Sequence, residues 1–391
     1  HHAASTAQQD ESQQMLLPTI SYLTEIHFAV GSVRLLAEVL AERRLTRPLL
    51  VTDSGIVAAG LTSQLPVEFS GVFAGVQTNP TLQNVEAGVT AFRDSGCDSI
   101  VALGGGSPID CAKAVAILAT HEPPLEQYAL IRGGLSRITA NKPPVIAIPT
   151  TSGTGSEVGR ASLITFDETT KLAIVGKHVI PDVAICDPAL TIGLPPLLTA
   201  ATGMDAISHC VETFCSPRFN PVAEAIALDG LGRACRWLPT AVDDGTNLEA
   251  RSELMMASME GALAFQKGLG LIHSLSHPLG ALPRGLHHGT LNSIFLPHVL
   301  RFNQQACAEK IDRMAAVAGI GTATSVSGAE LAQWFTTFAA AFGLPGRLSE
   351  LGILPNELDL LPEAAMQDHS TPTNPRSVTF EDCAALYSAA W

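Results

Sequence analysis

Residues 99–110 read SIVALGGGSPID, and this stretch determines the architecture of the first half of the chain. An apolar run at 99–103 is followed by three consecutive glycines (104–106), a serine and then Pro108. Glycines let a backbone approach a ligand closely, and the free N–H groups at a helix start attract phosphate. Pro108 suits the first helical turn, where no N–H is needed. The spacing differs from G-x-G-x-x-G, so a tight strand-to-helix turn without a ligand is the alternative interpretation.

Other apolar runs in the first half predict further strands around this one. Residues 48–52 (PLLVT) and 145–148 (VIAI) are the clearest, and residues 171–175 and 183–185 are shorter candidates. Helical stretches separate the long runs, and glycine or polar residues follow each of them. This order is typical of βα units whose strands end at one ligand-binding edge. We therefore expect an N-terminal α/β domain of the Rossmann-like, dinucleotide-binding type over residues 19–195.

The composition and periodicity of the sequence change after the proline-rich turn at 194–196. Beyond it, alanine, leucine, methionine and histidine recur with helical spacing, and few β-branched runs remain. A chain of 391 residues is also too long for one ordinary core. We expect an all-α C-terminal metal-binding domain over residues 196–391. Residues 1–18 are expected to be a polar tail without the order of a secretion signal, and the leading His1–His2 resembles the remnant of a purification tag.

Composition and charge exclude several classes of partner. Hydrophobic residues make up 46% of the chain and charged residues 15%, which is typical of a well-buried globular enzyme. The net charge of −14 argues against nucleic acid or an anionic membrane as partner, because both require a basic surface. The eight cysteines include no C-x-x-C pair, which indicates reduced thiols and a cytoplasmic location. We expect a small-molecule substrate and a homodimer or larger homo-oligomer.

A second polar loop, PTTSGTGSE at 149–157, follows the strand predicted at 145–148. Its hydroxyl groups and glycines suit a second part of the same dinucleotide, although such a loop also caps helices. Asp53 ends the first strand, where a carboxylate accepts hydrogen bonds from a ribose and repels a 2′-phosphate, so NAD(H) is favoured over NADP(H). A helix cap is the alternative role for Asp53. The candidate dinucleotide contacts in these segments are Asp53, Gly104, Gly105, Gly106, Ser107, Asp110, Thr150, Thr151 and Thr154.

Candidate metal ligands cluster in three short segments of the second half. Asp205 and His209 are four residues apart and share one helical face, and His273 and His277 repeat that spacing. A further pair of adjacent histidines occupies positions 287–288. Taken singly, each is more often a core histidine or a surface contact. Together, among apolar residues where unpaired polar groups are costly to bury, they predict a site for Fe²⁺ or Zn²⁺.

Four segments together resemble the iron-containing (group III) alcohol dehydrogenase family. They are GGGSPIDCAKA (104–114), PTTSGTGSE (149–157), the stretch 187–212 that contains GMDAISHCVE, and GLGLIHSLSHPLGA (268–281). The resemblance extends from about residue 51 to residue 376. It implies a dinucleotide site at the two loops, with a basic residue near the cofactor at Lys171, for which a solvated strand-end lysine is the alternative. The metal ligands that the resemblance implies are Asp205, His209, His273 and, from the His-Gly-x-x-Asn element, His288.

Two departures from the family pattern affect these assignments. Relative to the family pattern, one extra residue precedes the His-Gly element, so spacing alone selects His287 whereas the motif selects His288, and we choose His288. Lys267 lies where relatives more often carry small or neutral residues. With Arg160 and Arg284 it suggests an entrance for an anionic aldehyde, such as one bearing a carboxylate or phosphonate. Solvated surface charges are the alternative for each.

The expected activity is reversible hydride transfer between NAD(H) and a small alcohol or aldehyde, with a bound metal acting as Lewis acid. The resemblance places His277 beside the metal without tight binding, and its imidazole suits proton relay to solvent. The alternatives are a maleylacetate-reductase-like enzyme, a non-redox metalloenzyme of the dehydroquinate synthase type, and a non-catalytic binding protein.

Overall fold

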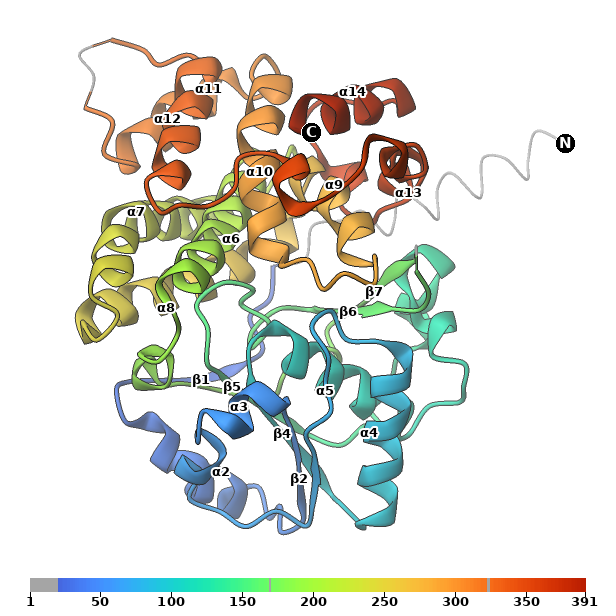
Figure 1. Cartoon of the computed structure of the whole chain (residues 1–391). Helices are drawn as coiled ribbons and strands as arrows, with labels where there is room; N and C mark the ends of the chain where they lie inside the picture. The colour runs from blue at the N-terminus through green and yellow to red at the C-terminus, as the bar shows by residue number, and fades with distance from the viewer. Residues whose placement is uncertain (1–19, 169, 322–323) are drawn as a thin grey trace, which may run out of the picture.

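A six-stranded parallel sheet forms the centre of the N-terminal half (Figure 1). The computed structural model describes residues 20–168, 170–321 and 324–391, so the tail expected over residues 1–18 lies outside the described residues. The spatial strand order is β1-β8-β5-β4-β2-β3. The strands are β1 (Glu25–Phe28), β2 (Pro48–Val51), β3 (Gly71–Phe73), β4 (Ser99–Gly104), β5 (Val145–Pro149) and β8 (Val183–Cys186).

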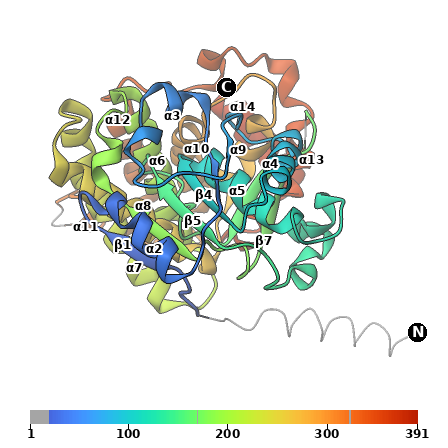
Figure 2. The ribbon, with the colours of Figure 1, turned by 90° about the horizontal axis from the view of Figure 1, so that it is seen from below.

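Helices cover both faces of this sheet, which explains why its central strands read as continuous apolar runs. Leu49 and Ile100 pack on the side of α4 and α5, whereas Leu50 and Val101 pack on the side of α2 (Figure 2). All residues of β2, β4 and β5 are buried. The helices of this half are α2 (Leu36–Glu42), α3 (Ser54–Ala58), α4 (Leu82–Asp94) and α5 (Gly106–Leu118).

The strand predicted at 171–175 is present as β7 (Lys171–Val175), but it lies outside the main sheet. It pairs antiparallel with β6 (Ala161–Thr165) in a separate two-stranded sheet. Its apolar residues pack onto the α5 side of the core through Ile174, and its three central residues are buried while its two ends are half-buried. The other predicted strands are confirmed within one residue at each end, and β1, β3 and β6 were not predicted.

Every described secondary-structure element after residue 195 is helical, as expected for the second half. The largest hydrophobic cluster of the described residues lies among these helices. Within the described ranges, no helix is both long and apolar enough to cross a membrane. The helices are α6 (Pro196–Cys215), α7 (Pro221–Asp243), α8 (Leu248–Leu263), α9 (Leu271–Gly280), α10 (His288–Asn303), α11 (Ala308–Val317), α12 (Gly328–Ala340), α13 (Leu361–Met366) and α14 (Phe380–Ala390).

The expectation that Lys267 lines an entrance is wrong, because its side chain is fully buried. Its ammonium donates hydrogen bonds to the backbone carbonyls of Thr213 at 2.9 Å, Phe214 at 2.8 Å and Ser216 at 2.6 Å. It also lies 3.0 Å from a carboxylate oxygen of Glu224. The last carbonyls of a helix have no partner within the helix and carry its negative dipole end. Lys267 therefore caps the C-terminus of α6.

We expect Lys267→Met to lower the free energy of unfolding by about 3 kcal/mol, because it removes the buried cation from the carbonyls that end α6 and leaves Glu224 with Lys310 as its remaining partner. Urea unfolding followed by circular dichroism measures this change. Arg284→Met, which breaks an exposed ion pair with Glu357, is the control and is expected to cost less than about 1 kcal/mol. Equal losses in the two variants would contradict the capping role.

Candidate metal and dinucleotide site

A single large cavity of about 1560 Å³ receives side chains from both halves of the chain. Its walls include the glycine loop before α5, the Thr-rich loop after β5, and histidines of α6, α9 and α10. The two loops are neighbours because β4 and β5 pair in register up to Gly104 and Pro149. Cavities at the carboxyl edge of an open α/β sheet are the usual location of ligand sites.

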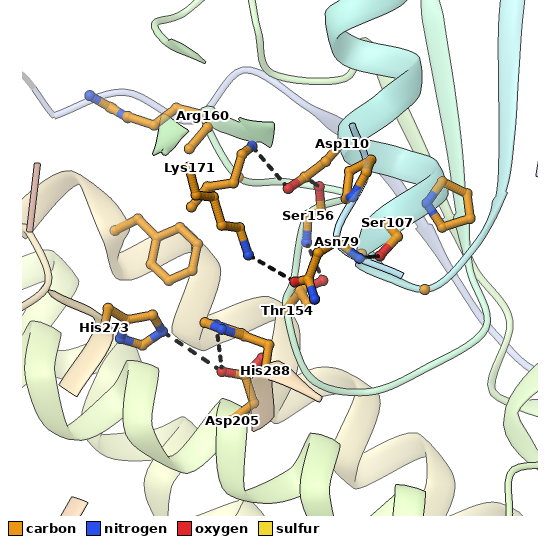
Figure 3. Close-up of a pocket in the computed structure, with 18 of the residues that line it drawn as sticks. Asn79, Ser107, Asp110, Thr154, Ser156, Arg160, Lys171, Asp205, His273 and His288 are labelled. Atoms are coloured by element: carbon orange, nitrogen blue, oxygen red, sulfur yellow. Dashed lines mark hydrogen bonds and ion pairs between the residues drawn. The ribbon is translucent and has the colours of Figure 1, made fainter. Parts of the chain in front are cut away.

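Four candidate metal ligands converge at one end of this cavity, where Figure 3 shows His273 and His288 directed toward Asp205. Asp205 and His209 lie on consecutive turns of α6, His273 lies on α9, and His288 is the first residue of α10. Their ligand atoms all lie within 4.8 Å of one another. From Oδ1 of Asp205, the Nε2 atoms lie 3.4 Å away in His209, 3.7 Å in His273 and 3.5 Å in His288.

These distances fit a shared metal ion better than direct hydrogen bonds. They exceed the usual 2.7–3.2 Å of N–H···O contacts. They match the separation of about 3.4 Å between neighbouring ligands in a tetrahedron with metal–ligand bonds of about 2.1 Å. Burial alone would raise the pKa of Asp205, but the imidazoles of His209 and His288 hold it far below its usual range. The donor set is therefore a buried carboxylate with three imidazoles, which suits Fe²⁺ or Zn²⁺.

Two of the three ligand histidines are already neutral without a metal. Burial lowers the pKa of His209 to about 4, and burial lowers that of His288 well below its usual value. Both rings are consequently neutral at pH 7 and offer a lone pair, as a metal ligand must. Against the effect of burial, Asp205 and Glu212 raise the pKa of His273 to about 9, so metal binding at that ring must displace a proton.

The structure brings His288 rather than His287 into the cluster. A Cβ atom on Gly289 would overlap the backbone carbonyl of Ala201 and come within 3.3 Å of Asp205. A glycine here lets the start of α10 approach α6 closely, and this approach carries His288 to Asp205. His287 precedes the helix and lines the cavity outside the four-residue group.

Two residues that orient the ligands were not selected from the sequence. Glu212 accepts a hydrogen bond from Nδ1 of His273 at 2.5 Å and from the backbone N–H of Ile272 at 3.0 Å. Asn292 donates from its amide to Asp205 at 2.8 Å. Their spacing could have identified them. Glu212 follows His209 by three residues and Asn292 follows His288 by four, so each lies on the same helical face as a ligand. Carboxylates that bind the distal nitrogen of a ligand histidine fix its tautomer and orientation.

His277 lies beside the cluster but outside it. Its Nδ1 atom is 2.7 Å from Oδ2 of Asp368, and its ring stacks between those of His288 and His369 at 5.5 and 5.6 Å. Burial lowers the pKa of His277 to about 4, against the opposing effect of Asp368. Asp368 and His369 were not identified from the sequence, because they lie 91 and 92 positions from His277 along the chain.

The glycine and threonine loops contact each other around the N-terminus of α5. A Cβ atom on Gly105 would lie 3.3 Å from the Thr151 methyl, and one on Gly106 would overlap Thr154. Gly104 has φ +149°, which L side chains rarely adopt. The two loops therefore pack closely only because these positions lack side chains. Among the candidate contacts, Gly105, Gly106, Ser107, Thr150, Thr151 and Thr154 line the cavity.

Asp53, Asp110 and Lys171, the other predicted cofactor residues in the cavity wall, each have a protein partner. Asp53 caps α3 by accepting the backbone N–H of Ile56 at 2.8 Å, which was its alternative role. Asp110 accepts hydrogen bonds from Ser156 and from the N–H of Leu163.

Lys171 is not a solvated strand-end lysine. Its ammonium donates to Oδ1 of Asn79 at 3.0 Å (Figure 3). The N–H of Asn79 in turn donates to Ser107, and the Asn79 amide donates to the carbonyl of Leu286. Asn79, which the sequence did not indicate, therefore links the glycine loop, β7 and the segment before α10. It adopts φ +56°, which few residues other than glycine tolerate.

Of the three basic residues that were expected at an entrance, only Arg160 lines the cavity. Lys267 is the buried cap of α6. Arg284 is absent from the cavity wall and pairs instead with Glu357 and the carbonyl of Gly352.

Comparison with known proteins assigns this architecture to a class of oxidoreductases. The model of the iron-containing alcohol dehydrogenase family matches residues 24–188, and that of the C-terminal part of the Fe-containing family matches residues 199–391. The chain is 48% identical to 4-hydroxybutyrate dehydrogenase from Cupriavidus necator over 93% of this chain and 97% of that one. The chain belongs to the iron-containing alcohol dehydrogenase family.

Solved structures agree with this assignment. A 1,3-propanediol oxidoreductase structure superimposes with a TM-score of 0.88 at 36% identity, covering 95% of this chain and all of the other. A sulfoacetaldehyde reductase from Bifidobacterium kashiwanohense, solved with NAD⁺, gives 0.84 at 28% identity over 96% and 98%. A maleylacetate reductase from Agrobacterium tumefaciens is a more distant neighbour, with a TM-score of 0.75 at 27% identity over 95% and 97%.

We expect Glu212→Gln to weaken metal affinity by about 10- to 100-fold, because the neutral amide no longer fixes the His273 ring as strongly. Chelator competition with metal quantified by mass spectrometry measures this. Glu249→Gln, on the exposed first turn of α8, is the matched control. Unchanged affinity in Glu212→Gln would show that His273 does not depend on this carboxylate.

Proposed function

We propose that the chain catalyses reversible hydride transfer between NAD(H) and a small alcohol or aldehyde at a metal ion held by Asp205, His209, His273 and His288. The observation that carries this proposal is that the four-ligand cluster and the glycine loop open into the same cavity. A Lewis-acid site and a dinucleotide site must share one space for hydride to pass to the substrate carbon.

The residues around the cluster support Fe²⁺ or Zn²⁺ as the ion, because one carboxylate and three imidazoles form a borderline ligand set. When bound, the metal supplies Lewis acidity at the substrate oxygen and the nicotinamide supplies or accepts the hydride. Asn292 and Glu212 hold Asp205 and His273 in place for this task. Both partners are buried, so they are not displaced by solvent.

The dinucleotide is proposed to bind along the sheet edge. Backbone N–H groups at the start of α5 and the loop hydroxyls suit the pyrophosphate. Asp53, which lines the cavity at the end of β2, suits the adenosine ribose and supports NAD(H) over NADP(H). Lys171, held by Asn79, is proposed to contact the cofactor from β7.

His277 is proposed to carry the proton that alcohol formation consumes. Its Nδ1 atom is occupied by Asp368, which directs the other ring nitrogen away from that carboxylate. The stacked ring of His369, which also lines the cavity, extends this path.

The decisive experiment is anaerobic metal reconstitution of the metal-free protein, assayed by NADH absorbance with a panel of neutral and anionic aldehydes. We expect turnover with Fe²⁺ or Zn²⁺ but not with Mg²⁺, which prefers oxygen ligands. His209→Gln should abolish the metal-dependent rate. Metal binding without any aldehyde-dependent loss of NADH would overturn the proposal and favour a non-redox metalloenzyme.

We expect Asp53→Asn to lower the ratio of kcat/KM with NADH to that with NADPH by about tenfold, since a negative charge no longer faces the 2′-phosphate. Asparagine caps a helix as well as aspartate, so thermal stability should be unchanged and serves as the control. An unchanged cofactor ratio would assign Asp53 to capping alone.

A further inference from the structure

The side chain of Lys113 is buried in the middle of α5. It is 1% exposed and belongs to a stretch of that helix in which apolar residues such as Ala112 and Val115 are also buried. Lys113 is not among the described residues that line the cavity. An ammonium group is costly to bury unless hydrogen-bond acceptors or an opposite charge surround it. The groups that Lys113 contacts therefore indicate its role.

Lys113 donates hydrogen bonds to two backbone carbonyls that follow the Thr-rich loop. Its Nζ atom lies 2.9 Å from the carbonyl oxygen of Gly159 and 2.9 Å from that of Ala161. A carboxylate oxygen of Asp110, which lies three residues earlier on the same face of α5, is 4.0 Å away. Burial lowers the pKa of Lys113 to about 8, against the opposing effect of Asp110, so the ammonium form still dominates at pH 7.

Asp110 binds the same part of the chain through both its side chain and its backbone. Its carboxylate accepts a hydrogen bond from the hydroxyl of Ser156, beside which it lies in Figure 3, and one at 3.1 Å from the backbone N–H of Leu163. Its backbone carbonyl accepts a hydrogen bond from the hydroxyl of Ser162 at 2.7 Å. One face of α5 thus holds the segment 156–163 at several points.

This segment cannot pair its own carbonyls through regular structure over most of its length. Between the end of β5 at Pro149 and the start of β6 at Ala161, the chain forms no helix or strand. Buried backbone carbonyls need hydrogen-bond partners, so the path of the segment depends on donors from other elements. Lys113 supplies such donors from α5.

The segment 156–163 joins two parts of the proposed dinucleotide site. At its start, the N–H of Ser156 donates to the hydroxyl of Thr154 at 3.3 Å, and a Cβ atom on Gly106 would overlap Thr154. At its end the segment becomes β6, in which Thr165 pairs with Lys171 of β7. The start of α5, the Thr-rich loop and Lys171 are therefore positioned relative to one another through this segment.

The candidate metal ligands are held by different contacts. They lie on α6, α9 and α10, where Glu212 and Asn292 orient them. The hydrogen bonds of Lys113 end in the N-terminal half, at residues 159 and 161. A change at Lys113 should consequently affect the dinucleotide site and leave the metal cluster intact.

We propose that Lys113 is a positioning residue for the dinucleotide site: by binding the carbonyls of Gly159 and Ala161, it sets the Thr-rich loop and β7 against the start of α5 in the arrangement that NAD(H) requires. This inference rests on the proposed function, which assigns NAD(H) to these loops. Asp110 shares this positioning role, which differs from the direct cofactor contact expected from the sequence.

The test is a fluorescence titration of the metal-loaded protein with NADH. In Lys113→Met, which fills a similar volume without donating, we expect the Kd for NADH to rise about tenfold, because displaced loops lose hydrogen bonds to the cofactor. Metal affinity, measured by chelator competition, should change less than about twofold, since the ligands lie on other helices. Lys113→Gln, which keeps an uncharged donor, should give a smaller rise in Kd.

Lys267→Met is the matched control, because it also removes a buried ammonium from backbone carbonyls. It should lose stability but keep its Kd for NADH within about twofold of the wild type, since Lys267 binds the end of α6. Asp110→Asn, whose amide can still pair with Ser156 and Leu163, should raise the Kd less than Asp110→Ala does.

Amide hydrogen exchange shows where Lys113 acts. In Lys113→Met we expect faster exchange at residues 150–163, with α9 and α10 protected as in the wild type.

Three results would overturn the inference. One is an unchanged Kd for NADH in both Lys113 variants, and another is an equal rise in Lys267→Met, which would reduce the effect to a general loss of stability. The third is a loss of metal affinity in Lys113→Met as large as the loss of NADH affinity.

A wild type that binds no NADH would instead contradict the proposed function. In that case, hydrogen exchange still decides whether Lys113 holds the segment 156–163. Faster exchange there in Lys113→Met supports the positioning contact, and unchanged exchange refutes it.

Discussion

The buried carboxylate of Asp205 is the constraint on which the arrangement of the helical half depends. An ionised carboxylate is stable in an apolar interior only when cations or hydrogen-bond donors surround it. Here its neighbours come from three helices: Asn292 of α10 donates a hydrogen bond to it, and His209 of α6, His273 of α9 and His288 of α10 lie at distances that suit a shared metal ion. A one-residue shift of any of these helices would rotate its ligand away from Asp205, so the cluster fixes the register of the three helices. Gly289 lacks a side chain, which allows the start of α10 to approach α6 closely.

The parallel sheet has a different role, which is to bring the two loops that are proposed to bind the dinucleotide to one edge. In-register pairing of β4 and β5 ends both strands at the same level, so their loops meet. Asn79 then joins this edge to the helical half through Ser107, Lys171 and the carbonyl of Leu286. The polar contacts of one asparagine thus hold the proposed dinucleotide loops in position relative to the candidate metal cluster, as hydride transfer between them would require.

The charged residues show where reasoning from sequence reached its limit. The strand–turn–helix pattern at 99–110 predicted the α/β half, and the paired spacings identified Asp205, His209 and His273 as candidate ligands. His288 was chosen over His287 from the family resemblance. The same approach grouped Lys267 with Arg160, although one caps a buried helix end and the other faces the cavity. Lys267 lies about fifty positions after the end of α6, so the sequence around it does not indicate that it will bind the carbonyls of that helix.

The sequence alone determined the periodic features: the buried strands, the helical second half, and ligand pairs three or four residues apart on one helix. These depend on local geometry, which repeats every two or 3.6 residues. Tertiary structure decided which of the two adjacent histidines joins Asp205, that Glu212 and Asp368 orient His273 and His277, that β7 leaves the main sheet, and which cations face the cavity. Each of these depends on contacts between segments far apart in the chain, where packing and the need to pair buried charges outweigh local pattern.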